Sequence, residues 1–113
     1  MMEPAEAARH YEEKGLVLTA LKQDFSREMT SVRSLASALA LLGRPMTKQG
    51  LQFALVYLAE AEYVKIWRVE DMPGFRADRM SEQNVQTVVF ARLLPKGLHL
   101  IDGLIPADPS VIF

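Results

Sequence analysis

The stretch "ALALLGRPMTKQGLQFALVYLAEAEYVKI", from Ala38 to Ile66, decides the fold of this chain. Its apolar first part ends at Gly43, because glycine enters the left-handed conformation that closes a helix without steric cost. Pro45 cannot continue a helix interior, since it lacks an N–H and its ring clashes with the preceding turn. Thr47 can cap a following helix, in which the apolar residues fall at i, i+3, i+4 and i+7: Leu51, Ala54, Leu55 and Leu58. The stretch therefore predicts two helices joined by a short turn.

The helix before this turn is predicted to begin just after Thr30 or Ser31, either of which can cap it. The turn that joins it to the next helix has about four residues, which is the spacing of helix-turn-helix units. Gly50, in the first turn of the second helix, would permit a close approach either of the preceding helix or of a DNA backbone. The residues of the earlier helix expected to face inward are Val32, Leu35, Leu39 and Leu42.

A longer helix is predicted upstream, from about Ala5 to Ser26, and its apolar stripe is wide. One side carries Leu16, Val17, Ala20 and Leu21, and another carries Leu18 and Phe25. So wide a stripe suits a helix that contacts both its own domain and a partner subunit, although a central core helix would look the same. We expect a homodimer in which Leu18 and Phe25 contribute to the interface.

Downstream of Glu62 the pattern becomes that of strands. The segments 63–70 and 85–92 are rich in β-branched and aromatic residues, and both read as strands. Residues 71–84 between them form a long predicted loop that carries Arg76 and Arg79. A short helix should follow, with Pro95 at its start and Gly103 past its end.

Composition limits the class of protein. The chain has 113 residues, half of them hydrophobic, a net charge of −1 and no cysteine. It is long enough for one domain with its own core, and no run reaches the roughly 18 to 20 apolar residues of a membrane span. The polar, acidic N-terminus does not read as a secretory leader, so we expect a cytoplasmic location without a membrane partner.

Charge is distributed unevenly along the sequence. No Asp or Glu occurs from Met29 to Ala59, a window that contains Arg33, Arg44 and Lys48. An acid-free stretch that spans the turn and its two helices suits a surface that approaches phosphate. Two mostly buried helices with few acids by chance would give the same pattern.

The predicted order is helix, helix, turn, helix, strand, loop, strand, helix, and it resembles the winged helix-turn-helix superfamily. The segment "LASALALLGRPMTKQGLQFALVYLAEAEYVKI" resembles its second helix, turn, third helix and first wing strand, and "VVFARLLPKGLHLIDG" resembles its last strand and final helix. The phrase "LLPKGLHLIDGLIPADPSV" is similar to small ArsR-related winged-helix proteins of Mu-like phages. The resemblance implies an α+β, mostly helical fold at residues 1–104, with a three-helix core, a two-stranded wing hairpin and a short C-terminal helix. It also implies a phage or prophage transcriptional regulator that binds double-stranded DNA.

In that fold the third helix enters the major groove, and the wing reaches the neighbouring backbone. Gln suits base recognition, because its amide can pair with adenine. The side chains expected to contact DNA are Arg33, Arg44, Thr47, Lys48, Gln49, Gln52, Arg76 and Arg79.

Two large apolar side chains on the outward arc of the third helix, Phe53 and Val56, complicate this interpretation. They would either pack against the wing or terminal helix as core, or meet thymine methyl groups, or bind another protein. The alternative function is therefore a winged-helix protein-protein adaptor without DNA binding.

Catalytic and metal-binding patterns are missing from the sequence. It has no G-x-S-x-G elbow, phosphate-binding glycine loop or H-E-x-x-H motif. His10 and His99 stand alone, and Glu12-Glu13 is most simply a solvated helix face. We expect no enzyme activity, no cofactor and no metal, although ArsR-type metal sensors commonly use cysteines or clustered histidines.

The last residues, 105–113, form an apolar tail with two prolines that favour an extended path. A chain that ends on Val111, Ile112 and Phe113 would expose an apolar patch unless something covers it. We expect this tail to dock, either on its own domain or on a partner subunit.

Overall fold

The computed structural model describes residues 3–23, 29–74 and 85–113, and it is α+β with helices predominating, as predicted. The described elements run in the order α1 (Pro4–Gln23), β1 (Thr30–Ser31), α2 (Val32–Leu41), α3 (Lys48–Glu60), β2 (Val64–Arg68), the 3₁₀ turn η1 (Val69–Asp71), β3 (Val88–Leu93) and α5 (Pro95–Ile101). Phe25, Arg76 and Arg79 lie outside the described residues, so the predictions made for them stay predictions.

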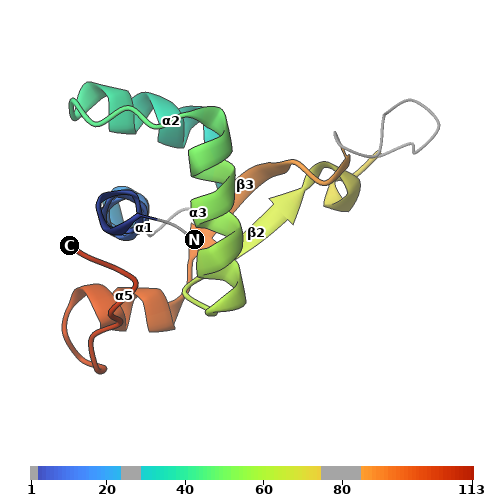
Figure 1. Cartoon of the computed structure of the whole chain (residues 1–113). Coiled ribbons are helices and arrows are strands. Elements are labelled where there is room, and N and C mark those ends of the chain that lie inside the picture. Colours follow the sequence, from blue (N-terminus) through green and yellow to red (C-terminus); the bar gives the residue numbers. More distant parts are fainter. Residues whose placement is uncertain (1–2, 24–28, 75–84) are drawn as a thin grey trace.

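Helix α1 is the centre of the molecule. Figure 1 shows it end-on, with α2, α3 and α5 around it, and it also contacts β3. This position explains the described part of its wide apolar stripe, because Val17, Leu18, Ala20 and Leu21 are buried in the core and Leu16 packs against it. Leu18 is fully buried in the core, with 0% of its surface exposed. The prediction that Leu18 faces a partner subunit is therefore wrong.

Local sequence signals fix α2 and α3. The Ser31 hydroxyl accepts a hydrogen bond from the Ser34 N–H at 3.0 Å, which confirms the predicted cap of α2. Leu35 and Leu39 face the core as predicted. Leu42 does not, because α2 ends at Leu41 and both residues of this terminal pair project into solvent. All four predicted inward residues of α3 are buried: Leu51, Ala54, Leu55 and Leu58.

The sheet has three antiparallel strands in the order β1-β3-β2, one more than the predicted hairpin. The extra strand is β1, where the sequence predicted only the cap of the following helix; Thr30 lies opposite Ala91. On the other edge Val64 lies opposite Leu93, and the register shifts between Trp67 and Arg68. The two long strands confirm the predicted wing strands, with ends shifted by a few residues.

The C-terminal tail docks on its own domain, and Figure 1 shows the C-terminus beside α1. Val111 is buried among the core residues, and the Ile112 N–H donates to the Tyr11 carbonyl at 3.0 Å. The Ile112 carbonyl also lies directly against Gly15, so a side chain at position 15 would collide with the tail backbone. Ile112 and Phe113 themselves remain exposed.

Candidate nucleic-acid interface

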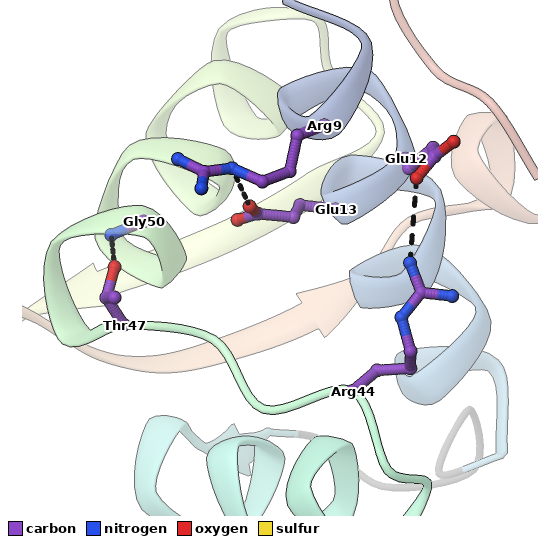
Figure 2. Close-up of polar contacts among 6 residues, drawn as sticks. All are labelled: Arg9, Glu12, Glu13, Arg44, Thr47 and Gly50. Carbon is purple, nitrogen blue, oxygen red and sulfur yellow. Dashed lines mark hydrogen bonds and ion pairs between the residues drawn. The ribbon is translucent and has the colours of Figure 1, made fainter. Parts of the chain in front are cut away.

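The turn between α2 and α3 has the geometry that its sequence predicted. Gly43 closes α2 with a φ of 75°, a left-handed conformation that glycine adopts readily. Thr47 begins α3, and its hydroxyl accepts a hydrogen bond from the Gly50 N–H at 2.9 Å (Figure 2). The cap satisfies one of the backbone donors that a helix leaves free at its N-terminus. Residues 44–49 thus form a mostly solvent-exposed segment that leads into the first turn of α3.

The outward face of α3 begins with polar side chains. Lys48 and Gln49 are exposed in its first turn, directly after the exposed Arg44 and Thr47. These four predicted contact residues are therefore brought together at one end of α3. Arg33 is also exposed, but it lies in the first turn of α2 and not in this segment.

Gln52 is held by the protein itself. Its side-chain amide donates to the Val88 carbonyl at 2.8 Å, and its carbonyl accepts from the Val88 N–H at 2.8 Å. The side chain pairs with β3 in the way that a neighbouring strand would, and both of its hydrogen-bonding ends are occupied. This corrects the prediction that Gln52 contacts a base: it joins α3 to the sheet. The sequence carries no signal for this pairing, because the two residues are 36 positions apart.

Phe53 and Val56 behave differently from each other. Val56 is partly buried against the core, which agrees with the first of its three interpretations. Phe53 is 52% exposed, and its ring centre lies 5.4 Å from that of His10 on α1 in a tilted arrangement. The core interpretation is therefore wrong for Phe53, while contact with thymine or with another protein stays open.

Acidic side chains of α1 reach this segment. The Glu12 carboxylate lies 3.6 Å from the Arg44 guanidinium, and Glu13, only 16% exposed, lies beside the first turn of α3 (Figure 2). Glu13 is therefore not the solvated residue that the sequence suggested. A hollow of about 460 Å³ separates the two helices here. Its lining comprises Glu6, Arg9, His10, Glu13, Pro45, Met46, Thr47, Gln49, Gly50 and Phe53.

A second polar cluster joins the tail to α1 and α3. The Lys14 ammonium is 3.5 Å from the centre of the Tyr57 ring, and Lys14 is 3% exposed. Burial lowers the pKa of Lys14, although the nearby Asp108 opposes this effect. The Tyr63 hydroxyl donates to the Asp108 carboxylate at 2.8 Å.

The two partners of that hydrogen bond have shifted pKa values. Burial and the bond to Asp108 raise the pKa of Tyr63 to about 12. Burial alone would raise the pKa of Asp108, but hydrogen bonds from Ser110 and Tyr63 and the charge of Lys14 outweigh it, so this pKa is lowered. The cluster stabilises the docked tail and lies apart from the turn.

In the described part of the chain, no three His, Cys, Asp or Glu side chains are grouped so that they could hold a metal ion. No described helix has the length and apolar character needed to cross a membrane.

The fold is a winged helix-turn-helix. It has three helices, of which α2 and α3 form the helix-turn-helix, followed by the two long strands β2 and β3 and the short final helix α5. Among solved structures the chain is similar to one described as "X-ray structure of PadR-like Transcription factor from bacteroid fragilis". The two are 12% identical, with a TM-score of 0.52, over 81% of this chain and 79% of that one. No family model and no curated protein matches the sequence. At this identity the likeness shows the fold alone, and the narrower resemblance to phage proteins stays a prediction.

Proposed function

We propose that this protein is a sequence-specific transcriptional regulator that binds double-stranded DNA through the turn and first turns of α3. The observation that carries the proposal is the run of exposed side chains around the start of α3: Arg44 lies in the turn, and Lys48 and Gln49 lie in the first turn of the capped helix. A capped helix end with cations and an amide is suited to phosphate contact and base recognition together. The solved structure that shares the fold is described as a transcription factor, which supports the same function class.

In this proposal the roles of the side chains differ. Arg44 and Lys48 contact phosphate, and Gln49 contacts a base edge in the major groove. Arg76 and Arg79 belong to the wing and contact the neighbouring backbone, as the sequence predicts. The proposal includes a homodimer, which would present two copies of α3 to successive major grooves. The narrower resemblance to phage proteins stays a prediction.

The test is a fluorescence polarisation titration against fragments of the neighbouring genomic region, followed by variants on the tightest fragment. Gln49→Ala should cost about 1–3 kcal/mol on that fragment and little on unrelated duplexes. Lys48→Ala should weaken binding to every duplex. It should also reduce the slope of log affinity against log salt by the contribution of about one phosphate contact. Absence of binding to all fragments at low salt would contradict the proposal.

The alternative is the protein-protein adaptor, and one observation favours it. Phe53 is a large apolar side chain that stays half-exposed on the face where a partner would bind. If the genomic fragments do not bind, a Phe53→Ser variant that loses a co-purifying protein would support the adaptor.

A further inference from the structure

Helix α1 places two carboxylates beside the turn and the first turn of α3. The first is Glu12, whose carboxylate pairs with the Arg44 guanidinium at 3.6 Å. Both side chains are about half exposed, so water and salt weaken the pair and leave it easily exchanged. Arg44 therefore meets an internal carboxylate before it meets DNA.

The second anion is Glu13, which lies beside the first turn of α3. A Cβ at position 50 would be 3.1 Å from the Glu13 Oε2, so Gly50 is what permits this approach. The other carboxylate oxygen is 3.4 Å from the Arg9 guanidinium, which holds the side chain in place. Because the N-terminus of a helix carries a partial positive charge, a carboxylate here competes directly with a phosphate. Figure 2 shows both carboxylates projecting from α1 toward the turn.

We propose that Glu12 and Glu13 act as an electrostatic brake on DNA binding. Their carboxylates neutralise positive charge at the turn and at the start of α3, and the phosphates of DNA must displace them. This inference rests on the proposed function. Sites with well-placed phosphates displace the carboxylates readily, whereas distorted or poorly matched duplexes do not. The brake thus lowers non-specific affinity more than specific affinity and sharpens discrimination between sequences.

The experiment measures binding of the full chain to a random-sequence duplex by fluorescence polarisation at several salt concentrations. Glu12→Gln and Glu13→Gln remove one charge each while they keep the side-chain shape. Glu3→Gln is the matched control, because it removes the same charge just before the start of α1, roughly 14 Å from Glu12 along the direction of the helix axis. We expect each of the first two variants to bind about two- to fivefold more tightly than wild type, and the control to stay near wild type.

A second readout tests whether the gain in affinity comes from breaking the Glu12–Arg44 ion pair or only from the change in net charge. Glu12→Gln frees Arg44 for one additional phosphate contact, so the slope of log affinity against log salt should steepen by about 0.9. In a background that carries Arg44→Gln, the gain from Glu12→Gln should disappear. Circular dichroism confirms that each variant is folded.

Each outcome has a defined meaning. Equal gains for Glu3→Gln and the two test variants would overturn the brake and leave only an effect of net charge. Wild-type binding without any gain in the test variants would overturn the brake and leave the proposed function intact. If neither wild type nor any variant binds duplex DNA at low salt, the proposed function and the brake both fail.

Discussion

Gln49 and Gln52 are three residues apart on α3. The structure uses Gln52 to join α3 to β3, and the proposed function has Gln49 contact DNA, so alanine substitution should separate the two residues. Gln52 makes two hydrogen bonds to the backbone of Val88, both at 2.8 Å. Each such bond contributes about 0.5–1.5 kcal/mol net, so Gln52→Ala should lower the free energy of unfolding by roughly 2 kcal/mol. For a domain of this size that corresponds to a fall in Tm of about 8 °C.

The control for this prediction is Gln49→Ala. Gln49 is exposed, and substitutions at such positions change stability by less than about 0.5 kcal/mol. Urea unfolding gives the free energies, and polarisation at a temperature where both variants are folded gives the DNA affinities. We expect Gln52→Ala to lower the free energy of unfolding with little change in DNA affinity. Gln49→Ala should lower DNA affinity with little change in stability. A stable Gln52→Ala variant that loses sequence preference would refute the assignment.

The remaining predictions concern the docked tail and its polar cluster. Gly15→Val should displace residues 111–113 and lower the free energy of unfolding by about 2 kcal/mol, because Val111 leaves the core. Light scattering should show an unchanged oligomeric state. A loss of self-association with an unchanged Tm would show instead that the tail serves a partner. Because the pKa of Tyr63 is raised to about 12, its contribution to stability is complete below pH 10 and is lost as the pH rises through 12, so Tyr63→Phe should flatten the alkaline fall in Tm. The pKa of Asp108 is lowered, so its contribution is present above the ordinary value of 3.8 and is lost as the pH falls through the folded value; Asp108→Asn should flatten the acid limb, and an unchanged limb would contradict this.

Features that depend on residues close in sequence were predicted correctly. The buried face of α3 follows from helical spacing alone, and Gly43 and Thr47 mark the ends of the helices because their backbone preferences are local. Lys48 and Gln49, which the sequence places at the N-terminal end of α3, are both exposed there. These are the parts of the candidate site that a sequence can specify by itself.

Features that depend on distant residues were missed. Strand β1 has two residues, too few for a periodic signal, and it exists because β3 pairs with it some 60 positions later. Gln52 looked like a base reader because its pairing with Val88 is likewise invisible locally. Leu18 looked like an interface residue because a stripe of apolar residues does not show whether the chain itself will cover it.

The electrostatics of the site were missed for the same reason. Residues 29–59 contain no acid, yet Glu12 and Glu13 reach the turn from α1 through space. An acid-free window in a sequence therefore does not guarantee an acid-free surface.

The central claim is that the first turn of α3 contacts DNA, and site-specific photocrosslinking tests it most directly. A benzophenone side chain is placed at position 49 and, as a control, at the exposed position 104, which lies beyond α5. Each protein is irradiated with a labelled duplex at low salt. The account predicts a crosslinked protein-DNA band for position 49 and none for position 104. A crosslink at position 104 with none at position 49 would contradict it.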